Sequence, residues 1–598
     1  MSLDSDLLSI QEVRTKVELA YAAWQKYRRF TQEQVDSIVE AMAAAARANA
    51  RHVAEMAVEE TGYGNAPDKL AKNLLAADLL PRTIRGMKTI GVIREIPDQK
   101  IVEIASPMGV VAAILPTTNP TSTAIYKIII ALKSGNAIVV SPHPRAKRCT
   151  CEIVAVMTEA ALRAGAPEGV IQCIGEPSLE ATNALMKHKR TGVILSTGGS
   201  GIVRAAYSSG KPAFGVGPGN VPVLVDTSAD IDRAVDGVVQ GKTFDFGTVC
   251  SSEQTIVAER SLRDRIIARL KVRKAFLCTP EQAKALARVL LTPQFTVTAD
   301  CVGQAAPVIA RKAGIDVPSD TSVLVAEIAG VGKEHPLSAE KLSPVLSLLF
   351  VDNFEAAILA CQAILRFGGL GHTCAIYGTD DARIREYAMR MPAFRVLANT
   401  PTPQGATGIT TNVFPAMTLG CGAVAGNITS DNIGPQHLIN MKRLAYYVRS
   451  AEEAFPGMSA PGDSTTGPID REKIVSAVER YLQNRGVAPT AGLAASLPPS
   501  SPARVPAVVS VADLVDQALA SRRAQLASVV TPTAAPTVDP VPETSPLPPL
   551  PIADFVCEDD VRQAIRKDRK IYIGTKTIVT PSARDLGSQY GILVQAER

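Results

Sequence analysis

The chain has 598 residues, 46% of them hydrophobic and 20% charged, and a formal net charge of +5. These values are typical of a soluble globular protein with room for about three or four domains. Lysine and arginine are spread along the chain and are not clustered with aromatic residues, so nucleic-acid binding has no support. The ten cysteines have no regular spacing and form no CxxC pairs. They argue against a disulfide framework or a structural zinc site and favour a reducing cytosol.

The N-terminus and the most apolar region both argue against membrane targeting. Residues 1–13 carry acids where a signal peptide has bases, and they lack a long apolar core. The apolar region 110–140 is interrupted by Pro116, Pro120, Lys127 and Lys133. It is therefore interpreted as two buried strands and a helix, and we expect no membrane span.

The first half of the chain alternates between strand and helix patterns. Apolar residues recur at helical spacing from residue 8 to about 87. A continuous apolar strand at 110–115 is followed by a helix through Lys133 and a second strand at 137–140, which is a βαβ unit. Further strands at 170–174 and 192–196 predict a mostly parallel sheet, with ligands at the carboxyl ends of its strands.

One cysteine stands apart from the others. Residues 243–254 read TFDFGTVCSSEQ and place Cys250 after a turn containing Gly247, just before the apolar, β-branched run 254–258. This predicts a thiol on a loop at the mouth of a buried strand. For the other cysteines the ordinary interpretation is a small buried hydrophobe. The order Phe-Asp, Gly, Cys, Ser-Glu-Gln resembles the nucleophile loop of CoA-acylating aldehyde dehydrogenases. Phe246 departs from that family, which commonly has Asn there, and we expect it to reshape the substrate pocket beside the thiol.

The loop 115–120, Leu-Pro-Thr-Thr-Asn-Pro, allows two interpretations of Asn119. Local rules make it a helix-capping residue before a proline at the first helical position. The resemblance implies that its amide donates a hydrogen bond to the developing oxyanion.

Several segments are candidates for binding the cofactor. The turn 197–201 opens a helix, so its N–H groups could approach a pyrophosphate, although it is not GxGxxG and such turns also occur for purely conformational reasons. Ser-Pro-His-Pro at 141–144 resembles the CoA-acylating branch, with His143 as an adenosine contact. The resemblance implies a nicotinamide ribose contact for Glu340, which local features alone would make a surface residue. The full set of cofactor candidates is Thr117, Ser141, His143, Pro144, Thr197, Gly198, Gly199, Ser200, Gly217 and Glu340. Basic residues at 145–148 leave NAD only modestly favoured over NADP.

Two further positions bear on the fate of the acyl group. Hydrolytic members of the family carry a glutamate at the position of Val216, where it activates the water that breaks the thioester. Valine cannot take a proton, so an acyl-enzyme would persist until a thiolate arrives. The loop 368–373 resembles one lining the active site of CoA-acylating members. His372 there either positions substrate or CoA, or is a hydrogen-bonded structural histidine.

The resemblance covers about residues 10–450 and implies an α/β, aldehyde dehydrogenase-like fold. Residues 1–230 would form a Rossmann-type NAD-binding domain with N-terminal helices, 231–430 the catalytic domain, and 431–455 the closing segment of the core. The implied reaction oxidises a small aldehyde (acetaldehyde, propionaldehyde or, less favoured, a sulfonated aldehyde) to acyl-CoA through an acyl-Cys250 thioester. It needs NAD and CoA and no metal, in a homodimer or homotetramer. The alternatives are a hydrolytic aldehyde dehydrogenase and a non-catalytic assembly protein.

After residue 447 the composition changes. Residues 456–551 are a Pro/Ala-rich linker with two amphipathic stretches, 470–484 and 511–526, each too short to be stable without a partner. Such helices resemble the encapsulation peptides that recruit enzymes to bacterial microcompartment shells, which implies a location in the microcompartment lumen within the cytoplasm. Docking on the enzyme's own surface is the alternative.

Residues 552–598 are expected to form a small α/β module. The pattern predicts a helix at 559–569, strands at 570–574 and 577–579, and a closing strand at 591–594. The run 580–585 resembles segments of other microcompartment-associated proteins.

Overall fold

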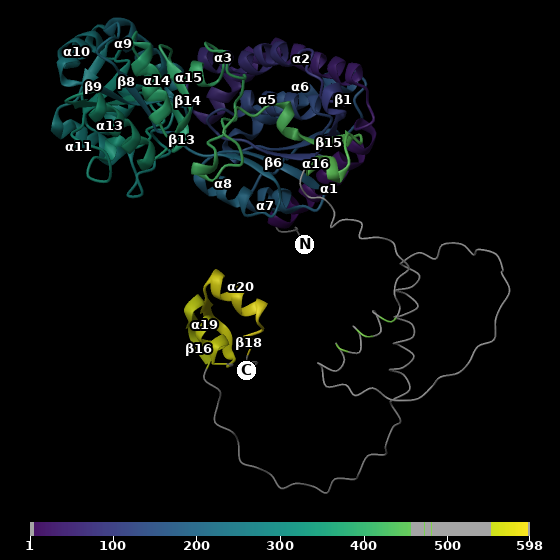
Figure 1. The fold of residues 1–598 in the computed structure, drawn as a ribbon. Helices are drawn as coiled ribbons and strands as arrows, with labels where there is room; N and C mark the ends of the chain where they lie inside the picture. The colour runs from purple at the N-terminus through teal and green to yellow at the C-terminus, as the bar shows by residue number, and fades with distance from the viewer. Residues whose placement is uncertain are drawn as a thin grey trace, which may run out of the picture. The chain divides into compact units, whose positions relative to one another are not determined.

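The computed structural model describes residues 5–455, the positions Glu472, Ser476 and Arg480, and residues 552–595 except Asp568. It divides into two compact units, Met1–Ser464 and Thr465–Arg598, drawn in Figure 1. The amphipathic stretch predicted at 511–526 lies outside the described residues, as does most of 470–484. Within the part of the chain that the structure describes, no helix is long and apolar enough to cross a membrane.

The chain begins with the predicted helices. They are α1 (Ser5–Tyr27), α2 (Gln32–Thr61), α3 (Ala66–Leu74) and α4 (Leu80–Ile84), with a π-helical turn at Leu75–Leu79. A capping box formed by Thr31 and Gln34 starts α2, and Gly62 ends it with φ 69°. The left-handed backbone of Gly62 thus separates α2 from α3.

A five-stranded parallel sheet follows, with strand order β5-β4-β3-β6-β7. Its strands are β3 (Val110–Ile114), β4 (Ala137–Ser141), β5 (Ile171–Cys173), β6 (Thr191–Thr197) and β7 (Ala213–Val216). The helices of this part are α5 (Pro120–Lys133), α6 (Lys147–Arg163), α7 (Leu179–Lys187) and α8 (Ser200–Tyr207). The chain builds outward from β3 to β5 and then returns to β6, so the topological switch point lies between β3 and β6. The buried Lys127 spans it and donates to the carbonyl oxygens of Ile114 (2.7 Å) and Leu195 (2.9 Å).

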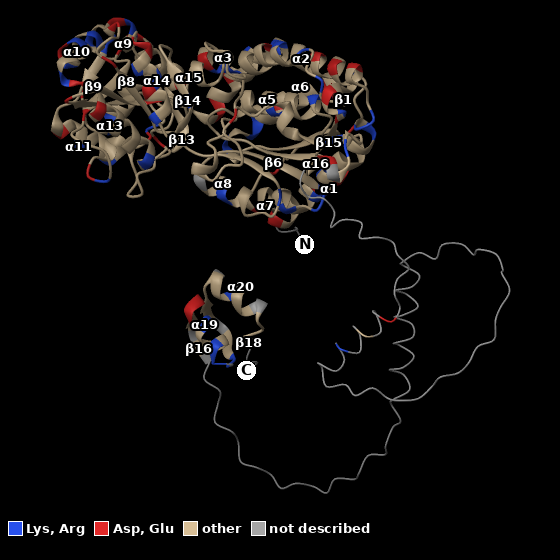
Figure 2. Ribbon diagram, in the orientation of Figure 1, with Lys and Arg blue, Asp and Glu red and all other residues tan. Residues whose placement is uncertain are grey.

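The second sheet is also parallel, with seven strands in the order β10-β11-β12-β9-β8-β13-β14. The strands are β8 (Val221–Val225), β9 (Glu253–Glu259), β10 (Ala275–Leu277), β11 (Val323–Glu327), β12 (Val345–Val351), β13 (Gly371–Tyr377) and β14 (Ala393–Ala398). Its helices are α9 (Ile231–Thr243), α10 (Arg263–Val272), α11 (Pro280–Leu290), α12 (Ala306–Lys312), α13 (Phe354–Phe367), α14 (Asp381–Arg390) and α15 (Thr402–Ala406). Charged residues lie mostly on the helices, and the strands of the sheets are mostly uncharged (Figure 2).

This topology corrects the domain boundary expected at residue 230. Because β8 belongs to the second sheet, the first domain ends between Val216 and Val221. An apolar strand fits either of two buried parallel sheets, so its periodicity does not reveal which one it joins.

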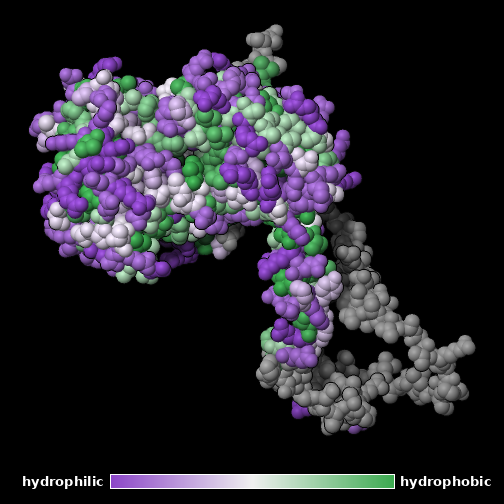
Figure 3. Space-filling view, turned by 90° about the horizontal axis from the view of Figure 1, so that it is seen from above, coloured by the Kyte–Doolittle hydropathy of each residue, from purple (hydrophilic) through white to green (hydrophobic). Residues whose placement is uncertain are grey.

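A small antiparallel sheet completes the core. It joins β1 (Gly91–Ile96), β2 (Ile101–Pro107) and β15 (Ile439–Ala445), in that order, and α16 (Ala451–Ala454) follows. The segment expected to close the core therefore pairs with a strand more than 300 residues earlier in the chain, Met441 lying opposite Ala105. Hydrophilic residues cover most of the core surface seen in Figure 3, yet Leu444, Tyr446 and Tyr447 beside this sheet are exposed.

The second unit is a three-stranded parallel sheet with two helices. Its elements are β16 (Ile552–Val556), α19 (Glu558–Arg566), β17 (Ile571–Val579), α20 (Pro581–Gln589) and β18 (Leu593–Gln595). The two short strands predicted at 570–574 and 577–579 are one strand, β17. Its pairing with β16 shifts register, and Thr577 Oγ1 donates to the carbonyl of Ala553 (2.5 Å) across that irregularity. The sequence patterns also missed β16 and α20, which pack around Val556 and Ala583 in a small core.

Candidate active site

Cys250 follows an unusual backbone turn. Asp245 and Phe246 have φ of 47° and 50°, and Gly247 has φ of 72°. Left-handed backbone costs roughly 1–2 kcal/mol for each non-glycine residue. At Gly247 a Cβ would also lie 2.9 Å from the carbonyl carbon of Ser343. The turn therefore needs contacts elsewhere to stabilise it, and the side chain of Asp245 supplies them.

The thiol faces a buried histidine. Nε2 of His372, at the start of β13, lies 3.2 Å from Sγ of Cys250. Nδ1 of the same ring lies 2.9 Å from Oγ1 of Thr373, which accepts a hydrogen bond from Nε of Arg395 (3.3 Å). His372 and Thr373 are both fully buried. The sequence did not reveal a base beside Cys250, because 122 residues separate the two side chains.

Both members of this pair are neutral near pH 7. Burial raises the pKa of the Cys250 thiol to about 12, and the nearby Glu340 adds to the shift. Burial and the charge of Arg395 hold the pKa of His372 well below its usual value. Since the thiolate is the nucleophile, the proton must leave Cys250 when ligands bind or during attack.

Asn119 occupies the first position before α5, but its side chain makes no capping hydrogen bond. The local interpretation is thus confirmed for the position, with Pro120 following at the start of the helix, but not for a capping side chain. Its Nδ2 instead donates to Oγ1 of Thr118 (3.1 Å) and to the carbonyl of Thr248 (3.4 Å) in the Cys250 loop. Its Oδ1 accepts from Nζ of Lys72.

The predicted cofactor residues of the first domain lie at one edge of the five-stranded sheet. They lie at or just after the carboxyl ends of β3 (Thr117), β4 (Ser141, His143, Pro144), β6 (Thr197, Gly198, Gly199, with Ser200 starting α8) and β7 (Gly217). No side-chain hydrogen bond caps the N-terminus of α8, and a Cβ placed on Gly199, Gly201 or Gly217 would meet no atom within 4 Å. A helix N-terminus with open space at a switch point fits a dinucleotide phosphate. Ser141 and His143 already have partners, in Oγ1 of Thr182 and the backbone N–H of Arg145.

Glu340 lies beside the nucleophile and not on the open surface. Its Oε1 accepts the N–H of Gly219 at 3.1 Å, and burial raises the pKa of its carboxyl to about 8. Its side chain is half-buried and not the fully exposed residue that local features alone predicted. Gly219 also packs closely against the Cys250 backbone. A Cβ added at Gly219 would lie only 2.0 Å from the carbonyl oxygen of Cys250.

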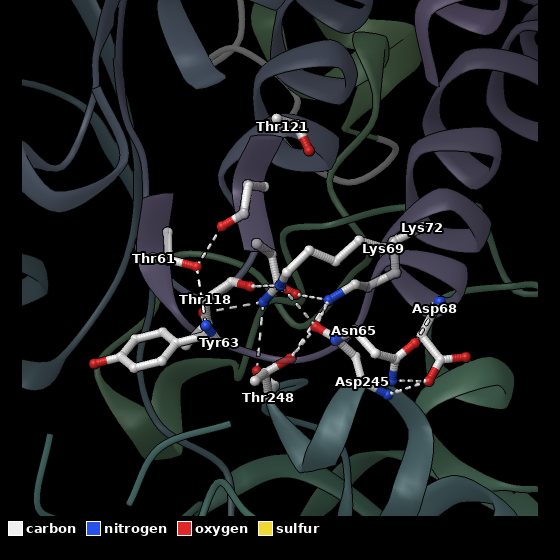
Figure 4. Close-up of polar contacts among 12 residues, drawn as sticks. Thr61, Tyr63, Asn65, Asp68, Lys69, Lys72, Thr118, Thr121, Asp245 and Thr248 are labelled. Atoms are coloured by element: carbon white, nitrogen blue, oxygen red, sulfur yellow. Dashed lines mark hydrogen bonds and ion pairs between the residues drawn. The ribbon is translucent and has the colours of Figure 1, made fainter. Parts of the chain in front are cut away.

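Sequence patterns did not single out several residues that surround the site. Arg395 and Thr373 support His372, and Lys69 and Lys72 of α3 converge on Asp245 (Figure 4). Both lysines are nearly fully buried. A lysine on an amphipathic helix is ordinarily interpreted as solvated, and only the fold reveals that this face is covered.

The fold and the cysteine site define an aldehyde dehydrogenase-type protein. A family model described as "Aldehyde dehydrogenase family" matches residues 6–285. The chain is 37% identical over 448 residues to the succinate-semialdehyde dehydrogenase (acetylating) of Clostridium kluyveri, covering 75% of this chain and 98% of that protein. The chain belongs to the aldehyde dehydrogenase family.

Other relatives are longer. The bifunctional aldehyde-alcohol dehydrogenase AdhE of Escherichia coli (strain K12) is 43% identical over 442 residues, which cover 73% of this chain and 50% of AdhE. The chain thus matches only about half the length of that relative.

Solved structures agree with the fold. An acetylating aldehyde dehydrogenase from Geobacillus thermoglucosidasius is 51% identical, with a TM-score of 0.74 over 75% of this chain and 99% of that one. A propionaldehyde dehydrogenase from Rhodopseudomonas palustris, solved with bound CoA and an acylated cysteine, is 29% identical, with a TM-score of 0.64 over 73% and 97% of the two chains. A propionaldehyde dehydrogenase from the fucose utilisation bacterial microcompartment of Clostridium phytofermentans is also 29% identical, with a TM-score of 0.65 over 73% and 97%.

Proposed function

We propose that this protein oxidises a small aldehyde to acyl-CoA with NAD and CoA. The observation that carries the proposal is the pairing of Cys250 with a neutral His372 at 3.2 Å, combined with a valine at position 216, where hydrolytic members carry their general base. The names of the acetylating relatives and the CoA-bound structure of the Rhodopseudomonas enzyme support the same chemistry.

The first chemical step is attack of Sγ of Cys250 on the aldehyde carbon. Nε2 of His372 is the nearest acceptor for the thiol proton in the tautomer that carries its hydrogen on Nδ1. Negative charge then develops on the former carbonyl oxygen. Nδ2 of Asn119 and the backbone N–H of Cys250 are the donors proposed to stabilise it.

The second step converts the adduct into a thioester. A bound dinucleotide would supply the hydride acceptor, and Thr197–Gly199, Gly217 and Glu340 are among the residues proposed to hold it. As the carbon–oxygen double bond re-forms, the carbon–hydrogen bond breaks and the acyl group remains on Cys250. His372, after losing its first proton to solvent, takes the proton of the CoA thiol as the CoA sulfur attacks this thioester, and Cys250 leaves as the thiolate that His372 then reprotonates.

Acyl transfer to CoA is favoured over hydrolysis by the groups around the thioester. Val216 is 3% exposed at the end of β7 and cannot take a proton. Burial raises the pKa of the nearby Glu340 carboxyl to about 8, so its charged form is disfavoured at neutral pH. Water therefore lacks the glutamate base that hydrolytic members carry, whereas a thiol is a far better nucleophile.

The substrate is proposed to be acetaldehyde or propionaldehyde, with a sulfonated aldehyde less favoured. Phe246 is half-buried in the Cys250 turn. An aromatic side chain there would favour an apolar aldehyde substituent. NAD is proposed over NADP, with the basic residues at 145–148 as the reason to test both.

Enclosure in a microcompartment is proposed from the tail. The three described positions within 470–484 have helical backbone, and Nε of Arg480 donates to the carbonyl of Ser476 at 3.2 Å. A helix in that stretch would present its apolar face to a shell protein. One similar enzyme comes from a microcompartment. Co-expression with shell proteins, comparing the full chain with a deletion of 456–551, tests this by co-sedimentation.

A homodimer or homotetramer is proposed from the small antiparallel sheet. Its exposed apolar residues Leu444, Tyr446 and Tyr447 form a patch of the kind that oligomer contacts cover. Analytical ultracentrifugation of wild type and Tyr447→Lys would test it, and a monomeric wild type would contradict it.

The central experiment follows nicotinamide reduction with propionaldehyde, with and without CoA, for wild type and Cys250→Ala. CoA-dependent turnover that the mutant lacks supports the proposal. Equal turnover without CoA would instead make this a hydrolytic enzyme. No turnover with any small aldehyde, with either NAD or NADP, would favour a non-catalytic assembly protein.

A further inference from the structure

One buried ammonium group joins the two loops that carry the proposed chemistry. Nζ of Lys72 in α3 contacts Oδ1 of Asn119 and Oδ2 of Asp245, and lies 3.4 Å from Oγ1 of Thr248. Figure 4 shows Lys72, Asp245 and Thr248 converging from two parts of the chain. The Lys72 side chain is 3% exposed, and that of Asp245 is fully buried. A buried charge is costly to desolvate, so its partners must supply what water would have supplied.

The contact fixes which way the Asn119 amide points. A lysine ammonium has three donors and no acceptor, so only the amide oxygen of Asn119 can face it. The NH₂ group must then point to the other side, where it meets the carbonyl of Thr248, two residues before Cys250. Without Lys72 the amide could rotate by 180° and present its oxygen to the developing oxyanion, which would repel it.

We propose that Lys72 is a positioning residue for aldehyde oxidation and holds the Asn119 amide with its N–H groups toward the reacting carbonyl. The inference rests on the proposed function, in which Asn119 is an oxyanion donor. Lys72 acts through Asn119 and does not itself touch the substrate.

The charge of Lys72 adds to this orientation. A cation on the amide oxygen polarises the amide and strengthens its N–H donors. The single negative charge of Asp245 does not fully neutralise Lys72, because Nζ of Lys69 also binds Oδ2 of Asp245 at 3.0 Å. Two fully buried ammonium groups therefore share one fully buried carboxylate. The partly buried Asp68 lies farther out, where its Oδ2 accepts the backbone N–H of Asp245 (2.7 Å).

Asp245 ties the same lysine to the nucleophile loop. Its Oδ2 accepts from Oγ1 of Thr248 (2.5 Å) and its Oδ1 from the backbone N–H of Asn65 (2.9 Å). These contacts offset the left-handed backbone at 245–246. Lys72 is thus placed to hold the Asn119 amide and the Cys250 loop in a fixed position relative to each other.

The experiment is a double-mutant cycle between Lys72 and Asn119, with Lys69→Met as the matched control. Lys69 contacts Asp245 and the backbone carbonyl of Thr118 (3.1 Å), and no hydrogen bond joins it to the Asn119 side chain. Lys69→Met therefore removes one positive charge beside Asp245, as Lys72→Met does. It leaves the contact between Lys72 and the Asn119 amide in place. The readout is the pre-steady-state burst of nicotinamide reduction with propionaldehyde before CoA is added. Nicotinamide binding and thermal unfolding are measured alongside.

Removing an oxyanion donor costs about 10²–10³-fold in rate. Asn119→Ala is expected to lose about that much, and Lys72→Met roughly 10²-fold, with little change in cofactor affinity. In the Asn119→Ala background, Lys72→Met should cost less than about 3-fold, because the group it positions is gone. Lys69→Met should slow the burst less than Lys72→Met does.

A second variant, Lys72→Gln, guards against failure to fold. It removes the charge and the buried ammonium but keeps an N–H donor able to face Oδ1 of Asn119. We expect its burst rate to fall between those of wild type and Lys72→Met. A Lys72 effect that multiplies fully with that of Asn119→Ala, or an equal effect of Lys69→Met, would overturn the inference.

The two proposals fail in different ways. A wild type that oxidises no aldehyde would remove the proposed function and this inference together. Normal CoA-dependent turnover, with Asn119→Ala impaired and both Lys72 variants at wild-type rates, would overturn the role of Lys72 alone.

Discussion

Nε2 of His372 lies 3.2 Å from Sγ of Cys250, and this pair links two strands of the same sheet. Cys250 stands on the loop before β9, and His372 is the second residue of β13. β8 lies between them and pairs with both strands. The parallel order of this sheet therefore brings a nucleophile and a candidate base to one position.

The reactivity of Cys250 should rise steeply with pH. Because the pKa of its thiol is raised to about 12, its alkylation by iodoacetamide should increase about tenfold for each pH unit from 6 to 10. Peptide mass spectrometry would measure this rate at Cys250 apart from the other cysteines. A plateau in the alkylation rate below pH 8 would contradict the raised pKa.

In His372→Ala, CoA-dependent turnover should fall by about 10²-fold or more.

Gly219→Ala should disable the site through packing alone. The new Cβ would lie 2.0 Å from the carbonyl oxygen of Cys250 and 3.4 Å from Cγ of His372, so the Cys250 loop must move. A displacement of about 1 Å can cost 10²-fold in rate, and we expect at least that loss in kcat/KM for the aldehyde.

Gly217→Ala is the matched control for Gly219→Ala. A Cβ at Gly217 meets nothing within 4 Å. Its effect should be limited to the KM for the cofactor, which is proposed to fill that space. Full activity of Gly219→Ala would mean that the loop geometry around Cys250 is wrong.

Glu253 should make stability depend on pH. It is fully buried; Oε1 accepts the N–H of Thr402 (2.6 Å), and within the described chain Oε2 has no partner. Burial raises the pKa of this carboxyl from 4.5 to about 7. The stabilisation from its protonated form is therefore complete below pH 4.5 and is lost as the pH rises through about 7.

Glu253→Gln removes this titration. Between pH 4.5 and 8, the free energy of unfolding of wild type should fall relative to that of Glu253→Gln. The whole fall over this range should be on the order of 3 kcal/mol. Chemical denaturation at pH 5, 6 and 7 measures the difference. The nearby Lys242, whose pKa burial lowers to about 7, contributes little below that pH. A constant difference across this range would contradict the raised pKa.

Deletion of the tail should leave catalysis unchanged. The described residues of the site all lie in the unit Met1–Ser464, which has its own hydrophobic core. A chain ending at residue 464 should keep the kcat/KM of the full chain within about 3-fold, measured with propionaldehyde and CoA. A large loss would assign the C-terminal unit a role in the reaction.

The sequence by itself determined several buried strands of the core and singled out Cys250 as the candidate nucleophile. Continuous apolar runs at 110–115 and 137–140 specified buried parallel strands, because only such strands are apolar on both faces. The turn around Gly247 marked Cys250, and the resemblance of its loop gave the family. Local hydrophobic periodicity carries this information because it depends on neighbours within a few residues.

Only the tertiary structure decided what each polar side chain faces. It moved β8 into the second sheet, turned Asn119 away from capping its own helix, placed His372 against Cys250, and buried Lys72 between Asn119 and Asp245. These contacts join residues tens to hundreds of positions apart. Their energies depend on burial and on the direction of donors and acceptors, and no local pattern of residues encodes either quantity.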